Sequence, residues 1–328
     1  IHYATINQRD RDFLRAAGIS AANLHVIPNA IPDLAVKTTP AERPFAKGKL
    51  FAFYPTRGIR RKNVGELLLL ALIYGERVEF ATSMRPENPE WQAGHDEWER
   101  LVDELGLPVK LGLADEGGYP FFDLLGWSDF VVTTSIAEGF GLAFLEPWIV
   151  GKPVMGRDLP EITRDFRENG IHLDNLYPRI DVPVAWIDPE ELAEAVESML
   201  RRSYLAYDCP LPRGAVKQTL KAWIRNGSVD FGVLGECFQM RILRMLRADP
   251  GLLDQITIPP LALCTEREIM ERRELIRRIY SLDTYAARLE EVYDCVLFGA
   301  VGKVGHLAPR RVLARFLDPT RLNLLRNG

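Results

Sequence analysis

The sequence has few cysteines, no long apolar run and no glycine-rich dinucleotide fingerprint. Four cysteines lie about thirty residues apart with no Cys-x-x-Cys pair, which predicts neither a disulfide framework nor a zinc site. The longest apolar run, Leu67 to Tyr74, has eight residues and is too short to cross a bilayer. Because no G-x-G-x-x-G follows the first predicted strand, a nicotinamide-dependent dehydrogenase is disfavoured.

The chain also lacks an excess of positive charge. Its 41 Lys and Arg residues against 45 Asp and Glu residues give a formal net charge of −4, which argues against nucleic acid as a partner. With 328 residues, 47% of them hydrophobic, the chain is long enough for two compact regions. The cysteine usage favours a reducing cytoplasm. Since the chain begins at Ile1 without a signal-peptide pattern, we expect that an upstream segment was removed or not included.

Short apolar runs alternate with longer helical segments between residues 49 and 158. This alternation is typical of a Rossmann-like α/β fold, in which helices flank a parallel sheet. The predicted strands are 50–54, 78–81, 109–112, 129–133 and 153–155. The predicted helices lie near 63–75, 89–105, 119–126, 141–150 and 160–168. Ligands bind beyond the carboxyl ends of such strands, where Arg57, Lys62 and Glu138 fall.

The C-terminal part of the sequence is predicted to be mainly helical. A capping pattern with proline at the first helical position predicts a helix over 188–202, and two prolines and a glycine make 209–214 a linker. Residues 215–298 are predicted to be mostly helix, with a second capping box at 265–268. Their apolar stripe from 223 to 246 is expected to form helical core.

A loop with four cations follows the first predicted strand. It carries Arg57, Arg60, Arg61 and Lys62, and Asn63 opens the next predicted helix. Cations at the carboxyl end of a strand and beside a helix N-terminus are suited to bind a diphosphate. A solvated basic loop is the alternative for this segment when it is considered alone.

Two carboxylates, Glu138 and Glu146, flank the sequence Gly139-Phe140-Gly141 after the fourth predicted strand. Glycines allow the backbone to approach a ligand closely, and a helix behind them would aim N–H groups at an anion. The carboxylates can accept hydrogen bonds from ligand hydroxyls. On spacing alone, a strand-to-helix connection with two solvated acids is the alternative.

Four segments together resemble the retaining GT-B glycosyltransferases of the group 1 (family 4) type. Residues 25–29 resemble the connection into the nucleotide-binding domain, and Arg57 with Lys62 resembles the pair that binds the donor diphosphate. Residues 138–146 match the E-x7-E signature with its internal Gly-Phe-Gly, and 151–158 resemble the strand after it. The resemblance implies the C-terminal half of a GT-B fold with a mainly helical extension.

The resemblance also implies a role for each residue of these segments. Glu138 would contact the donor sugar, and Glu146 would accept hydrogen bonds from the ribose. Arg57 and Lys62 would stabilise the departing diphosphate in place of a divalent metal. The other donor-binding residues that the resemblance implies are Gly139, Phe140, Gly141, Leu142, Arg61 and Asn63. It implies no protein nucleophile, no metal and no cofactor beyond the donor.

The implied activity is metal-independent transfer of a hexose from a UDP-, GDP- or ADP-linked donor to an unidentified acceptor, with retention of anomeric configuration. Two alternatives stay open. One is a non-catalytic GT-B-like module that binds the donor or serves as a scaffold. The other is a GT-B sugar-nucleotide epimerase, which would form a new sugar nucleotide without an acceptor.

The sequence departs from the family pattern at several positions. Thr56 stands where the family usually has glycine, so Arg60 or Arg61 could share the phosphate role of Arg57. Pro147 directly follows Glu146 and is expected to bend the helix predicted there.

We therefore expect three regions. Residues 1–40 would be a remnant of the acceptor domain with the interdomain linker, 41–203 the donor domain, and 204–328 a mainly helical region with a GT-B-like terminal helix at 280–294. Most of an acceptor domain is expected to be missing. The tail 299–328 carries five arginines and one lysine against one aspartate, which suits an anionic acceptor, peripheral contact with a membrane surface, or simply a solvated helix face.

Overall fold

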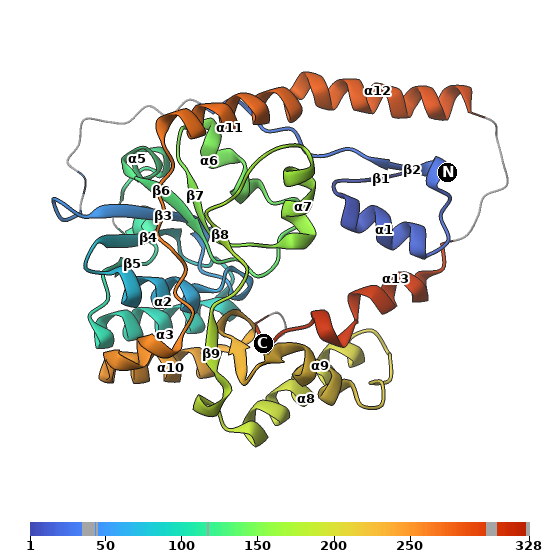
Figure 1. The fold of residues 1–328 in the computed structure, drawn as a ribbon. Helices are drawn as coiled ribbons and strands as arrows, with labels where there is room; N and C mark the ends of the chain where they lie inside the picture. The colour runs from blue at the N-terminus through green and yellow to red at the C-terminus, as the bar shows by residue number, and fades with distance from the viewer. Residues whose placement is uncertain (35–42, 44, 117, 300–306, 326–328) are drawn as a thin grey trace.

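A six-stranded parallel sheet with helices on both faces forms the centre of the computed structural model, which describes residues 1–34, 43, 45–116, 118–299 and 307–325 (Figure 1). The strands, in spatial order, are β5 (Val109–Lys110), β4 (Val78–Met84), β3 (Leu50–Arg57), β6 (Phe130–Thr133), β7 (Val154–Arg157) and β8 (Leu176–Tyr177). All five predicted strands are present, and every neighbouring pair is parallel. The predicted α/β class is confirmed, and β8 is an addition to it.

The helices that follow these strands lie close to their predicted positions, except that α4 was not predicted and α6 is shorter than predicted. They are α2 (Val64–Tyr74), α3 (Pro89–Leu105), α4 (Leu113–Glu116), α5 (Phe121–Trp127), α6 (Glu146–Ile149) and α7 (Pro160–Glu168). The side chain of Asn88 caps α3 by accepting from the Glu90 N–H, and proline opens both α3 and α7. Such local signals explain why these bounds could be predicted from sequence.

Helix α2 explains the apolar run seen in the sequence. Leu67, Leu68, Leu69 and Leu70 all have no exposed surface, because α2 packs against the sheet on one side and a C-terminal helix, α10 (Glu236–Ala248), on the other. A helix covered on both sides is apolar all round instead of on one face.

The predicted helix at 141–150 is wrong as a single element. A 3-10 turn over Leu142–Phe144 comes first, and α6 starts afresh at Glu146. Pro147 lies in the first turn of α6, where a helical N–H has no partner in any case. Pro147 therefore begins helix α6, and the predicted bend within a longer helix is wrong.

The C-terminal region adds a small antiparallel sheet that the sequence analysis missed. Its strands are β10 (Ile224–Arg225), β11 (Ser228–Asp230) and β9 (Asp181–Pro183), and its helices are α8 (Pro189–Leu205), α9 (Ala215–Trp223) and α10. Asn226 and Gly227 have φ of 51° and 76°, as a two-residue hairpin turn requires. The stripe from 223 to 246 is largely buried as predicted, but it is helical only at its two ends, in α9 and α10, because the hairpin and a 3-10 turn lie between them.

Residues on both sides of the boundary expected at 203 share one hydrophobic core, which runs from Ala52 to Leu324. The boundary expected at 40 lies outside the described residues. The predicted capping box is present at the start of α11 (Glu266–Ile279). The predicted terminal helix is α12 (Leu282–Phe298), which has no buried residue and extends past the N-terminal elements (Figure 1).

The N-terminal elements are β1 (Tyr3–Thr5), α1 (Gln8–Ala16) and β2 (Leu24–Val26), where β1 and β2 pair in parallel. The last helix, α13 (Pro309–Phe316), packs on α1, with the ring of Phe316 edge-on to that of Phe13 at 5.5 Å. Of the basic tail, 300–306 and 326–328 lie outside the described residues. Within the described ranges, no helix combines the length and apolar character needed to cross a membrane.

Candidate functional site

The basic loop after β3 and the turn after β6 meet at the carboxylate of Glu138. Nζ of Lys62 lies 2.5 Å from Oε1 of Glu138, and Nη1 of Arg61 lies 3.1 Å from its Oε2. The two loops are about eighty residues apart in sequence, and they meet because β3 and β6 are adjacent parallel strands. The structure thus brings together three of the predicted site residues.

Backbone carbonyls of the basic loop are tied to the end of β6. The Ile136 N–H donates to the carbonyl of Arg61 at 2.9 Å, and the Thr134 hydroxyl donates to that of Lys62 at 2.9 Å. The Tyr54 hydroxyl donates to the same Lys62 carbonyl at 3.1 Å. These bonds fix the loop that carries the cations, so Lys62 and Glu138 are preorganised for a ligand.

Glu138 is ionised at neutral pH although it is largely buried. Burial alone would raise its pKa, but the charge and hydrogen bond of Lys62, with help from Ser135 and Arg61, lower the pKa below its usual value. The side chain is 11% exposed. A fixed negative charge held between two cations is suited to accept hydrogen bonds from sugar hydroxyls.

A cavity of about 380 Å³ opens beside this cluster, and we call it the Glu146 cavity. Lys62, Glu138 and Glu146 provide its charged groups, and the rest of its wall is mainly apolar. The lining residues are Ile6, Asn29, Leu34, Pro55, Lys62, Phe121, Leu125, Glu138, Phe140, Gly141, Leu142, Ala143, Glu146 and Pro147. A mostly apolar cleft with a few convergent polar groups is the usual form of a ligand site.

The carboxylate of Glu146 has no hydrogen-bond or ion-pair partner among the described residues. Burial is the one cause that acts on its pKa, which lies above the usual value. Glu146 stands at the first turn of α6 and faces the same cavity as Glu138. An acceptor group kept partly buried without a protein donor is suited to hydroxyls from a ligand.

A Glu146→Gln variant is expected to be slightly more stable than the parent chain at pH 7. The raised pKa of Glu146 means that the folded state favours the protonated form of this side chain. As pH rises from the pKa of the unfolded state to that of the folded state, the carboxylate therefore lowers the stability of the fold, and this cost remains at neutral pH. Thermal unfolding should show a melting temperature about 1–3 °C higher at pH 7. The gain should disappear near pH 4, and a variant that is less stable at pH 7 would contradict this account.

The two glycines of the turn differ in what they do for the fold. Gly141 has φ of 95°, and a methyl group there would lie 2.7 Å from Cγ2 of Ile162. Gly139 has no left-handed backbone, and a methyl group on it would meet no described atom within 4 Å. Gly141 is therefore required by packing, whereas Gly139 borders open space on the far side of the turn.

Alanine at these two positions should separate the roles. We expect Gly141→Ala to lower the free energy of unfolding by about 1–3 kcal/mol, because the backbone is strained and Ile162 must move. Gly139→Ala should change it by less than about 0.5 kcal/mol. Urea unfolding of both variants measures this, and equal losses would show that both glycines serve the fold.

Two of the predicted site residues are engaged elsewhere. The Arg57 guanidinium lies 2.9 Å from Oε1 of Glu87, after an irregularity in the pairing of β3 with β4, and it does not line the Glu146 cavity. Asn63 has φ of 54° and is buried, and its side-chain amide donates to Glu66 at 2.9 Å. Its side chain therefore points into the core and away from the cavity.

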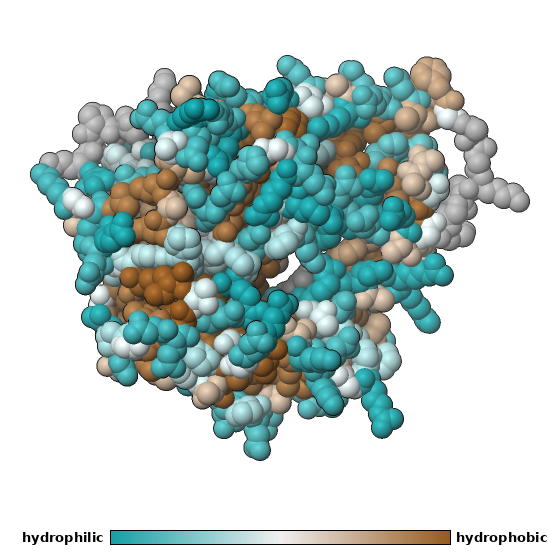
Figure 2. Space-filling view, in the orientation of Figure 1, coloured by the Kyte–Doolittle hydropathy of each residue, from teal (hydrophilic) through white to brown (hydrophobic). Residues whose placement is uncertain are grey.

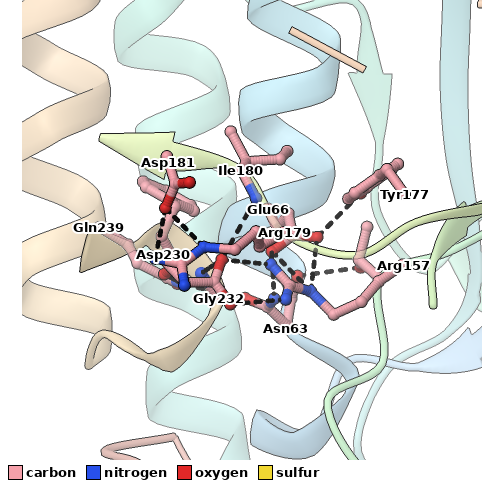
Figure 3. A network of polar contacts seen from close by, with 12 residues as sticks. Asn63, Glu66, Arg157, Tyr177, Arg179, Ile180, Asp181, Asp230, Gly232 and Gln239 are labelled. Carbon is pink, nitrogen blue, oxygen red and sulfur yellow. Dashed lines mark hydrogen bonds and ion pairs between the residues drawn. The ribbon is translucent and has the colours of Figure 1, made fainter. Parts of the chain in front are cut away.

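Asn63 belongs to a buried polar network that fixes the base of the loop (Figure 3). Arg157 of β7 pairs with Glu66 of α2 and, through Nη1 at 2.7 Å and Nη2 at 2.8 Å, with Asp230 of β11. The Tyr177 hydroxyl donates to Glu66 at 2.8 Å. The network joins β7 of the large sheet to β11 of the C-terminal sheet. Asn63, which belongs to it, directly follows Lys62 in the sequence.

Sequence reasoning missed two cavity residues with suitable chemistry. Phe121 is 39% exposed and borders the Glu146 cavity, where it can stack on a planar ring. Asn29 also lines this cavity, from the segment after β2. An apolar residue at the start of a predicted helix is expected to lie in the hydrophobic core, so nothing in the sequence indicated that Phe121 borders a ligand cavity.

Comparison of the sequence with known proteins identifies a relative that is a sugar-related synthase by name. No protein-family profile matches the chain. It is 26% identical over 254 residues to a mannosylglucosyl-3-phosphoglycerate synthase of Petrotoga mobilis, covering 71% of this chain and 48% of that protein. The chain therefore spans about half the length of this curated relative.

Solved structures share the architecture at lower identity. HepE of Anabaena in complex with UDP superposes with a TM-score of 0.50 and 16% identity over 89% of this chain and 63% of that one. HepE in complex with UDP and glucose gives 0.50 and 15% over 91% and 63%. The parallel sheet flanked by helices thus has the GT-B-like fold that the sequence resemblance implied.

Proposed function

We propose that this chain is the donor-binding part of a glycosyltransferase, which transfers a sugar from a nucleotide-diphosphate sugar to an acceptor. The observation that carries this proposal is the pair of Lys62 and Glu138, which Arg61 joins from outside the cavity, at a cavity whose other charged group, Glu146, has no protein partner among the described residues. The Petrotoga relative is named a synthase of a glycosylated phosphoglycerate, and HepE was solved with UDP and with glucose. The HepE complex supports a nucleotide and a sugar as ligands, and the name of the relative supports synthesis of a glycosylated product.

Each residue then has a chemical task. Lys62, with Arg61 beside it, neutralises the diphosphate; Glu146 accepts from the ribose hydroxyls; and Phe121 stacks on the base. When the bond from the anomeric carbon to the diphosphate breaks, its electron pair leaves on the diphosphate. The acceptor oxygen bonds to the anomeric carbon, and its proton passes to the departing phosphate. Fixed cations at the leaving group stabilise the charge that develops there.

Several finer parts of the proposal rest on the sequence resemblance alone. They are retention of anomeric configuration, independence of a divalent metal, a hexose as the transferred sugar, the group 1 type and the diphosphate role of Arg57. A cytoplasmic location is proposed from the cysteine usage instead. For Arg57 to act, its guanidinium has to leave Glu87 when the donor binds. Since both side chains are half-exposed or more, that ion pair contributes little and can exchange.

Titration of the chain with UDP, GDP and ADP tests the proposal. One of the three should raise the melting temperature by about 4–6 °C at a hundred times its Kd, because a ligand that binds the folded state alone stabilises it by mass action. The matching nucleoside, which lacks the diphosphate, should give a much smaller shift. If none of the three diphosphates raises the melting temperature, the proposal fails.

A further inference from the structure

A second cavity lies on the other side of the Glu138 turn, and we call it the arginine cavity. It has a volume of about 440 Å³, and its polar wall includes Arg9, Arg61, Glu138, Gly139, Glu161 and Arg321. Figure 2 shows an opening between α7 and the C-terminal segment, the two elements that contribute Glu161 and Arg321. The donor site proposed above lies on the opposite face of Glu138; of its residues, Glu138 and Arg61 also line this cavity.

Two of the arginines come from opposite ends of the chain and are held in place by packing. Arg9 lies on α1, and Arg321 ends a 3-10 turn at Pro319–Arg321. The Arg321 guanidinium lies 4.8 Å over the ring of Phe13, on the next turn of α1 after Arg9. Stacking of this kind orients the flat guanidinium. The fold therefore gathers cations that no sequence motif connects.

Both guanidinium groups keep donors that the protein does not use. Arg9 donates to Asp10 at 2.9 Å and to the carbonyl of Glu138 at 3.3 Å. Arg321 donates to Glu161 at 2.6 Å and to the carbonyl of Arg315 at 3.3 Å. Since a guanidinium has five N–H groups, three on each have no acceptor among the described residues. The side chains are only 21% and 24% exposed, so these donors face the cavity more than bulk water.

The charges around the cavity leave a positive excess in a chain that is negative overall. Of the charged residues that line the cavity, Arg9, Arg61 and Arg321 are cations and Glu138 and Glu161 are carboxylates, so three cations face two carboxylates. Glu161 is 49% exposed and sits at the rim, where it can turn into solvent. Exposed ion pairs contribute little to stability, whereas an arginine binds a phosphate through two parallel hydrogen bonds. A phosphate can therefore replace Glu161.

We propose that the arginine cavity binds a phosphate group of the acceptor molecule. This inference rests on the proposed transferase function and names the acceptor class for it. Glu138 lines both cavities, so an acceptor anchored by its phosphate on one side of this residue has its hydroxyl close to the donor sugar on the other. The proposal also gives a binding role to Arg321 of the basic tail, which has no role in the proposed donor site.

Glycerol 3-phosphate and glycerol form a matched pair of probes, because they differ only by the phosphate. Isothermal titration at low ionic strength, with the donor site saturated by whichever of UDP, GDP and ADP binds, should show binding of glycerol 3-phosphate and none of glycerol. Arg321→Met and Arg9→Met should each weaken that binding at least about tenfold, since each removes charged hydrogen bonds to the phosphate. Arg311→Met removes an exposed cation of α13 outside the cavity and should leave binding unchanged.

The outcomes separate this inference from the donor proposal. If one of the three nucleoside diphosphates binds and glycerol 3-phosphate does not, or if that diphosphate displaces glycerol 3-phosphate, the inference is overturned, because the cavity then has no separate phosphate site. If none of UDP, GDP and ADP binds while Arg321→Met and Arg9→Met weaken binding of glycerol 3-phosphate, the phosphate site stands and the donor proposal falls. The two variants lie on different elements, the C-terminal 3-10 turn and α1. A loss of binding in both would therefore not be explained by loss of the packing of the C-terminal segment alone.

Discussion

An Arg157→Met variant is expected to lose about 3–5 kcal/mol of unfolding free energy, close to half of a typical domain's stability. Arg157 is 6% exposed and is the one cation in contact with Glu66 and Asp230 among the described residues. Glu66 has no exposed surface, and burial raises its pKa while Arg157 opposes that rise. Without the guanidinium, two buried acids face each other with no counter-charge.

The pH dependence of this loss gives an independent check. Removing Arg157 raises the pKa of Glu66 further, so in the variant Glu66 takes up a proton at a higher pH than in the parent chain. A raised folded pKa makes the variant lose stability as pH rises and recover part of it as pH falls. Urea unfolding at pH 7 and pH 5 should therefore show a smaller difference between variant and parent at pH 5.

Two control variants keep the interpretation specific. Arg157→Met with Glu66→Gln should recover part of the loss, because one buried charge is then gone. Arg164→Met removes a half-exposed arginine of α7 that pairs with surface acids, and it should cost at most about 1 kcal/mol. If Arg157→Met costs no more than Arg164→Met, the buried network does not hold the two sheets together.

Five of the six strands of the large sheet could be predicted because each of them carries its own local signal. The strands are continuous apolar runs, as strands covered on both faces must be, and the helices carry caps and prolines at their first turns. The elements that the prediction missed are short. Strand β8 has two residues, and the 3-10 turn before α6 has three, which is too few to show a helical or strand periodicity in the sequence. Short elements are held by neighbours instead of by their own periodicity, so the sequence alone could not reveal them.

The site was predictable only in part, for a similar reason. The resemblance placed Lys62 and Glu138 in one site, and the structure brings them together at 2.5 Å. It could not show that the Arg57 guanidinium meets Glu87 or that the Asn63 side chain turns into the core. Those placements depend on one irregularity in strand pairing and on one left-handed residue, and neither leaves a mark in residue spacing.

A Lys62→Ala variant is expected to bind its nucleoside diphosphate about 10- to 100-fold more weakly than the parent chain. Lys62 faces the Glu146 cavity, and its ammonium group is the point charge that a diphosphate needs. Its removal also leaves Glu138, a negative charge, beside the bound phosphates. Lys221→Ala, an exposed lysine of α9 that lines neither the Glu146 cavity nor the arginine cavity, should leave the affinity unchanged.

Glu138→Gln distinguishes loss of a ligand contact from loss of local structure. Lys62→Ala alone leaves a largely buried carboxylate with fewer partners, so it should also lower stability, whereas the double variant Lys62→Ala with Glu138→Gln removes both charges and should recover much of that loss. The double variant should still bind the diphosphate weakly, because the cation is missing. Recovery of affinity together with stability would mean that Lys62 acts by holding Glu138. Weak affinity at restored stability would mean that Lys62 itself contacts the diphosphate, as the donor proposal requires.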